Sequence, residues 1–158
     1  MKQPAGKLRE FFFGAADPRA YALVRISFAI VALLNLIDLW PDRHAFFSNA
    51  GLIDLETLRQ NTTGAPFISV FYWIQEPAGV TAMFMVAAIA LVALGCGYAT
   101  RMCAIIAWLW HCSYVTRAFP AMHGWDVLLR IIAFILMVSP SDRKWCLDGL
   151  WNRKTIQF

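Results

Sequence analysis

The stretch His123-Gly-Trp-Asp-Val-Leu-Leu-Arg-Ile-Ile-Ala-Phe-Ile-Leu-Met-Val138 is an apolar run that contains two ionisable residues, Asp126 and Arg130. Charged groups are costly in hydrocarbon, so they are retained there when they are paired or face a protein interior. The stretch therefore predicts a membrane-spanning helix and also a candidate site. At a spacing of i, i+4 the two charges are predicted to pair and to fix the packing of the helices, with a ligand-binding role as the alternative.

The composition of the whole chain indicates the same class of protein. Hydrophobic residues make up 59% of the 158 residues and charged residues 15%, whereas a soluble domain averages about half and about a quarter. A chain of this length is expected to form one domain, here residues 1–158. The net charge of +4 is small and scattered, so we expect no nucleic-acid partner.

Four apolar segments predict an all-α, integral membrane four-helix bundle with additional interfacial helices. They are residues 21–40, 78–95, 102–119 and 123–140, each close to the length that crosses a ~30 Å hydrocarbon core. A soluble bundle is the alternative, but residues 83–94 are apolar on nearly every face of a helix. The connection 42–76 is the main region outside the membrane, with a short amphipathic helix expected at 54–59 and an aromatic segment, 67–74, expected in the outer interface.

The basic residues predict the orientation. Those near the two ends of the chain and in the turn after the second span are Lys2, Lys7, Arg9, Arg19, Arg101, Arg143, Lys144, Arg153 and Lys154, whereas Arg43, Arg59 and Arg117 lie on the other side. The positive-inside rule then places both termini in the cytoplasm. We expect an integral protein of the bacterial inner membrane, in contact with membrane lipids and with other integral membrane proteins.

Polar residues of the predicted spans concentrate toward the outer half of the bundle. They are Asn35 and Asp38 of the first span, His111 and Arg117 of the third, and His123, Asp126 and Arg130 of the fourth. Such a group would form either a helix-fixing cluster or a polar pocket that opens outward. A bound lipid, quinone or pigment would suit the pocket, although the sequence requires none. A haem bundle would need two facing histidines at one depth, and only His111 is deep.

No motif in the sequence assigns a catalytic residue or a metal site. The chain has no HExxH motif, no Gly-rich phosphate loop and no Ser/His/Asp series. The cysteines, Cys96, Cys103, Cys112 and Cys146, show no Cys-x-x-Cys spacing, so we expect them to pack as apolar residues. Arg25 lies about one turn inside the cytoplasmic end of the first span. It is expected either to snorkel to the headgroups or to contact the turn 97–101 or Asp148.

Several motifs occur in an order that points to one family. They are Asp17-Pro-Arg-Ala-Tyr-Ala-Leu-Val-Arg25, Gly95-Cys-Gly-Tyr-Ala-Thr-Arg101, His123-Gly-Trp-Asp126, Pro140 and Trp145-Cys-Leu-Asp148. Together they resemble the opening, the glycine–arginine hairpin, the Gly-Asp helix and the Trp-x-x-Asp element of the HTTM domain, the transmembrane module shared with vitamin K-dependent gamma-carboxylase. The resemblance covers approximately residues 11–151. It implies structural roles on the cytoplasmic side for Asp17, Arg25, Arg101, Trp145 and Asp148.

The resemblance also bears on catalysis. In the carboxylases the reactive lysine lies in a later span, after the Trp-x-x-Asp element, and the sequence here ends at Phe158 without that span. Its lysines, Lys2, Lys7, Lys144 and Lys154, lie in the flanks. Carboxylation needs a base that drives formation of a carbanion, so we expect no carboxylation by this polypeptide alone.

Three functions follow from these observations. The first is a non-catalytic membrane subunit or assembly module of a larger, energy-converting complex, packed against helices, lipid or quinone and pigment groups. The alternative is half of a carboxylase-like or quinone- or lipid-binding enzyme whose other half is a second polypeptide. A transporter has little support, because the chain shows neither repeats nor broken helices.

Overall fold

The computed structural model describes residues 18–49, 51–52, 56, 69–118 and 123–139. Within these residues the protein is all-α, as predicted. The helices are α2 (Pro18–Leu39), α3 (Arg43–Phe47), α5 (Pro77–Cys96), α6 (Thr100–Arg117) and α7 (Gly124–Val138), with one 3-10 turn, η1 (Val70–Tyr72). Asp17, Trp145, Asp148 and most of the helix predicted at 54–59 lie outside the described residues.

The ends of α5 follow from its sequence. Pro77 begins the helix, where its missing N–H costs no hydrogen bond. At the other end Gly97 adopts the left-handed conformation (φ 73°), and the amides of Gly97 and Tyr98 donate to the carbonyls of Leu94 and Ala93 at 3.0 and 2.9 Å. Only residues 97–99 separate α5 from α6, so the predicted tight hairpin is present.

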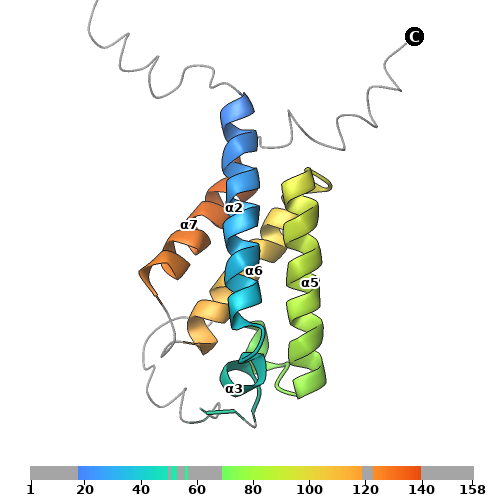
Figure 1. Cartoon of the computed structure of the whole chain (residues 1–158), viewed down its shortest axis with the longest axis vertical. Coiled ribbons are helices and arrows are strands. Elements are labelled where there is room, and N and C mark those ends of the chain that lie inside the picture. The colour runs from blue at the N-terminus through green and yellow to red at the C-terminus, as the bar shows by residue number, and fades with distance from the viewer. Residues whose placement is uncertain (1–17, 50, 53–55, 57–68, 119–122, 140–158) are drawn as a thin grey trace, which may run out of the picture.

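The long helices contact one another in a closed order. α2 packs against α5 and α7, and α6 packs against α5 and α7. Figure 1 shows α2 and α5 side by side, with α6 crossing behind them. α3 and η1 lie at the end where α2 finishes and α5 begins, and they contact α5 and α6 respectively.

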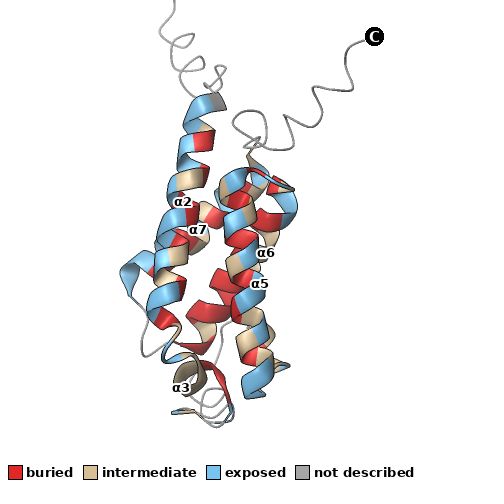
Figure 2. Ribbon diagram, turned by 45° about the vertical axis from the view of Figure 1, so that its right-hand side comes forward, coloured by how far each residue is buried: buried red, intermediate tan, exposed pale blue. Residues whose placement is uncertain are grey.

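Two helices, Arg19–Leu39 and Pro77–Cys96, are long and apolar enough to cross a membrane. Figure 2 shows exposed residues on the outward faces of both. Large apolar side chains are among them, such as Ile37 on α2 and Ile89 on α5, which are 63% and 65% exposed. The inward faces carry small residues that allow close approach: a methyl group added at Gly95 would lie 3.2 Å from Cβ of Ala29.

Within the aromatic segment 67–74, which is expected in the outer interface, the side chain of Phe71 is fully buried within the protein. It belongs to an aromatic cluster that consists of Phe47, Phe71, Phe84, Trp110 and Tyr114. The ring centroids of Phe47 and Phe71 are 4.8 Å apart, as are those of Phe84 and Trp110. Tilted and edge-on ring contacts of this kind add to the gain from burial, which explains why the segment folds inward.

Candidate functional site

Asp126 is the centre of the candidate site. It lies in the first turn of α7, and its side chain is fully buried. Its Oδ1 accepts a hydrogen bond from Nδ2 of Asn35 on α2 at 3.1 Å. Its Oδ2 accepts one from the backbone N–H of His123, the residue that caps α7, at 2.7 Å. A single carboxylate therefore caps one helix and ties it to another that is distant in sequence.

Tyr114 of α6 completes this group. Its side chain is 2% exposed, and the side chains of Asp126 and Asn35 lie near its hydroxyl. A buried phenol is favoured beside polar groups, and here those groups come from α2 and α7. Three helices thus meet at one set of polar side chains.

His111, three residues before Tyr114 on α6, is buried next to this set. Its Nδ1 lies 2.7 Å from the carbonyl oxygen of Ala107. Because a carbonyl only accepts, Nδ1 carries the proton, and Nε2 of the neutral ring is an acceptor. Nε2 is buried without a hydrogen-bond partner among the described residues, and the charge of Asp126 is close enough to act on the ring. We call Asn35, His111, Tyr114 and Asp126 the polar core.

The other predicted site residues lie outside the polar core or at its edge. Asp38 is exposed near the end of α2, where its charge is close enough to act on Tyr114. Arg117 is buried, but its Nη2 donates to the carbonyl oxygen of Ser48 at 3.0 Å, beside the aromatic cluster. The His123 side chain is exposed and stacks on Trp125, with ring centroids 4.8 Å apart. The backbone amide of His123 donates to the Asp126 carboxylate, and the two residues form a capping box at the start of α7.

The predicted ion pair between Asp126 and Arg130 is not formed among the described residues. Both oxygens of Asp126 accept hydrogen bonds from Asn35 and from the His123 backbone. Arg130 is half-buried on the flank of α7, where its charge acts on Cys112 of α6. The backbone amide of His123 and the side-chain amide of Asn35 therefore occupy the Asp126 carboxylate, which the i, i+4 spacing predicted to pair with Arg130.

Two residues expected on the cytoplasmic side are described. The side chain of Arg25 is fully buried, so the prediction that it snorkels outward is wrong. Arg101 is exposed in the first turn of α6. The expected contact of Arg25 with Asp148 involves a residue outside the described ones.

Sequence reasoning missed Tyr114 and the anchoring of η1. Tyr114 resembles an ordinary apolar residue of a span, and its only signal is its position one turn from His111. Ser113 holds η1 through two hydrogen bonds: Ser69 Oγ donates to its carbonyl at 3.1 Å, and the Val70 amide donates to its Oγ at 3.0 Å. Contacts between residues more than forty positions apart leave no periodic pattern in the sequence.

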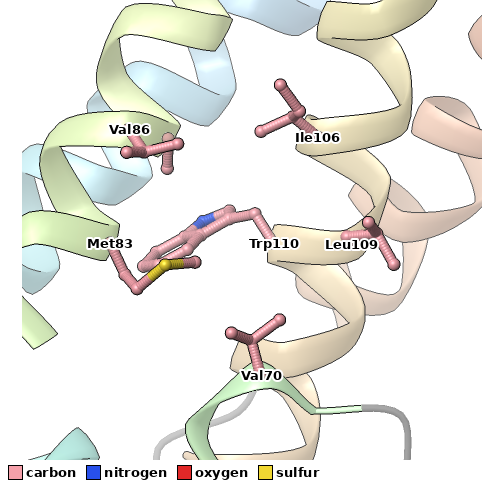
Figure 3. Close-up of a pocket in the computed structure, with 7 residues that line it drawn as sticks. Val70, Met83, Val86, Ile106, Leu109 and Trp110 are labelled. Carbon is pink, nitrogen blue, oxygen red and sulfur yellow. The ribbon is translucent and has the colours of Figure 1, made fainter. Parts of the chain in front are cut away.

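A hollow of about 190 Å³ lies between α5 and α6, on the side of α6 that faces the aromatic cluster. Figure 3 shows the Trp110 indole reaching between the two helices, with Met83, Val86 and Ile106 around it. All of its lining side chains are apolar or aromatic: Val70, Met83, Val86, Ala87, Ile106, Leu109 and Trp110. It can accept an apolar group, whereas the polar core can exchange hydrogen bonds with a carbonyl or hydroxyl.

The hollow and the polar core therefore differ in the ligands that they can bind. Among the described residues there is no group of three histidine, cysteine or acidic side chains that could hold a metal ion. Comparison with known proteins finds no family model, no curated protein and no solved structure that matches the chain.

Proposed function

We propose that this protein is a non-catalytic subunit or assembly module of a larger membrane complex. In this proposal α2, α5, α6 and α7 form a membrane-spanning four-helix bundle in a bacterial inner membrane, with both termini in the cytoplasm. The observation that carries the proposal is the distribution of polarity, which is apolar outside and polar inside.

The outward faces of the helices expose large apolar side chains in rows. Examples are Leu23, Ile30, Leu34 and Ile37 on α2, Met85, Ile89 and Val92 on α5, and Leu128, Ile131, Ile135 and Val138 on α7. The charged side chains of Arg25 and Asp126 are fully buried. A water-soluble protein has the opposite arrangement. Lipid tails solvate apolar side chains, and ionisable residues then turn to the interior, so the pattern supports a membrane location.

The polar core supports the non-catalytic role. The two oxygens of Asp126 are used to cap α7 and to bind Asn35 of α2. A carboxylate engaged in this way on both oxygens serves to position the helices. The resemblance of residues 95–101 and 123–126 to the HTTM domain supports the same placement of the hairpin and of α7.

The orientation is tested by labelling single cysteines with a membrane-impermeant maleimide. One variant keeps Cys96, which is exposed at the end of α5, and has its other cysteines replaced by serine. The matched variant also lacks Cys96 and carries Leu52→Cys, at a position 74% exposed in the outer connection. We expect Cys96 to react only in inverted vesicles and the cysteine at 52 only in spheroplasts. Reaction of both from one side would contradict the proposed topology.

The subunit role is tested by purifying the full chain from native membranes in mild detergent, followed by native mass spectrometry. We expect a defined complex with other integral membrane proteins. A free monomer, or release of the protein from membranes by alkaline carbonate, would contradict the proposal.

The second candidate function is a quinone- or lipid-binding enzyme completed by another polypeptide. It is favoured by His111, whose buried Nε2 is available to accept a hydrogen bond from a ligand hydroxyl. Replacement His111→Leu should then remove bound quinone or lipid, measured by solvent extraction and mass spectrometry. The exposed His123→Leu change is the control. Equal ligand content in wild type and His111→Leu would eliminate this candidate.

A further inference from the structure

Arg130 lies in the middle of an apolar helix. No acidic side chain within the described part of the chain pairs with its guanidinium. Arg130 is the seventh of the fifteen residues of α7, so it lies roughly 9 Å along the axis from the first residue and 12 Å from the last. It is half-buried, with exposed Ile131 next to it and exposed Phe134 one turn beyond. The nearest buried carboxylate, Asp126, has both oxygens hydrogen-bonded elsewhere.

The surroundings of Arg130 form a surface made by two helices. Cys112 and Trp108 lie one turn apart on α6, and Arg130 and Phe134 lie one turn apart on α7. The charge of Arg130 acts on Cys112, and the rings of Trp108 and Phe134 are 6.1 Å apart. We call Trp108, Cys112, Arg130 and Phe134 the α6–α7 seam, of which Cys112 is the buried member at 8% exposed. It presents one positive charge beside aromatic rings.

A guanidinium that faces hydrocarbon at this depth calls for an anion. A carboxylate on a neighbouring transmembrane helix can lie at the depth of Arg130, whereas a lipid phosphate would require the arginine side chain to extend along α7 toward its end. A planar guanidinium also binds a carboxylate through two parallel hydrogen bonds, which fixes the relative orientation of the two helices. The charge, the depth and the aromatic frame all favour an acidic side chain on a protein helix.

We propose that the α6–α7 seam is the docking surface for a partner subunit, and that Arg130 pairs there with an aspartate or glutamate inside a membrane-spanning helix of that partner. This inference rests on the proposed subunit function and names the chemistry of the partner. It assigns to Arg130 a role between chains, in place of the pair within α7 that the sequence predicts.

The test is photo-crosslinking of the full chain in native membranes. The photoreactive residue p-benzoylphenylalanine replaces Phe134 in the seam or, as matched control, Leu128. Leu128 is two residues from Arg130 and thus on the opposite side of α7, and it is 55% exposed. We expect the probe at 134 to capture one polypeptide whose crosslinked peptide carries an aspartate or glutamate within an apolar span. The probe at 128 should give lipid adducts.

Charge variants at Arg130 then decide whether the guanidinium is responsible. Arg130→Gln should lower the yield of the crosslink at 134 by about tenfold, as expected for loss of a polar contact between membrane helices. Arg130→Lys should retain more of the yield, and Leu128→Gln, which adds the same polar group on the far side, should leave it unchanged. Where Arg130→Gln fails to assemble, Arg130→Glu combined with an acidic-to-arginine change in the captured partner should restore the crosslink.

Three results would overturn the inference. They are an unchanged crosslink in Arg130→Gln, capture of phospholipid in place of protein at position 134, and anionic lipid that co-purifies with wild type but not with Arg130→Gln. If Arg130→Gln still co-purifies with the full complex, the seam proposal fails and the subunit function stands. If wild-type protein is found alone, the subunit function itself fails.

Discussion

The two sides of α6 are held to their neighbours by different means. Toward α5, α3 and η1, it contributes Trp110 to the aromatic cluster, where rings and apolar side chains fill the space. Toward α2 and α7, it contributes His111 and Tyr114 to the polar core, beside the hydrogen bond between Asn35 and Asp126. Tyr114 belongs to both groups, because its ring also lies 6.0 Å from that of Phe47. α6 thus lies between a mainly aromatic interface and one that contains a directed hydrogen bond.

The difference teaches how a helix can be both stably and specifically placed. Apolar packing gains energy from many weak contacts and tolerates small changes in angle. A buried hydrogen bond has strict geometry, and leaving its donor or acceptor unpaired is costly. We therefore infer that the aromatic side supplies most of the stability, and that the polar side fixes the rotation of α7 about its axis.

Truncation of a side chain in the aromatic cluster is expected to give the largest loss of folding stability. Phe84→Ala should lower the free energy of unfolding by about 3–5 kcal/mol, because Phe84 is fully buried against Phe47 and Trp110. The measurement is thermal unfolding in detergent with a thiol-reactive dye that reaches Cys103 and Cys112 on unfolding, in a background with Cys96→Ser and Cys146→Ser. Phe84→Leu is the control and should cost less. Equal losses for leucine and alanine would argue against area as the source of stability.

Truncation of a side chain in the polar core is expected to give an intermediate loss of folding stability. Asp126→Ala should cost about 2–4 kcal/mol, because it leaves the Asn35 amide and the His123 N–H without their acceptor. Asp126→Asn keeps an acceptor for Asn35 and should cost less.

A double-mutant cycle of Asn35→Ala and Asp126→Ala, measured by the same unfolding assay, isolates the contact between α2 and α7. The exposed Asp38→Ala change on α2 serves as control. Purely additive effects would contradict a direct bond between the two helices.

A polar deletion on the aromatic side is expected to give the smallest loss. Ser113→Ala removes the acceptor of the Val70 amide, but Phe71 of η1 remains packed in the aromatic cluster. We expect a loss of about 1 kcal/mol, since Val70 is only partly buried. Limited proteolysis of the connection before α5 reports on the same anchor. A loss as large as that for Asp126→Ala would remove the distinction between the two sides.

The sequence predicted the long helices because their limits are local. Apolar runs bounded by Pro77 and Gly97 place α5 to within one residue, and the other three ranges agree to within a few residues. It did not predict α3 or the inward packing of Phe71, since these depend on contacts made only in the folded chain.

Only part of the candidate site could be predicted from the sequence, because some of its contacts join residues that are distant along the chain. Of the predicted group, Asn35, His111 and Asp126 lie close together in the structure, and they were noticed because polar residues inside an apolar run are conspicuous. The partner of Asp126 was not predicted. Spacing along one helix suggested Arg130, but the partner lies on α2.

The bond between Asn35 and Asp126 spans 91 positions of the chain, and this has a consequence for biosynthesis. The hairpin of α5 and α6 is joined by residues 97–99 and can pair as soon as it is made. At roughly 5–20 residues per second, Asp126 follows Asn35 by about 5–18 seconds. During that interval the Asn35 amide must wait for its acceptor, so the polar core closes last. The arrival of α7 is therefore the step that completes the described arrangement of four long helices.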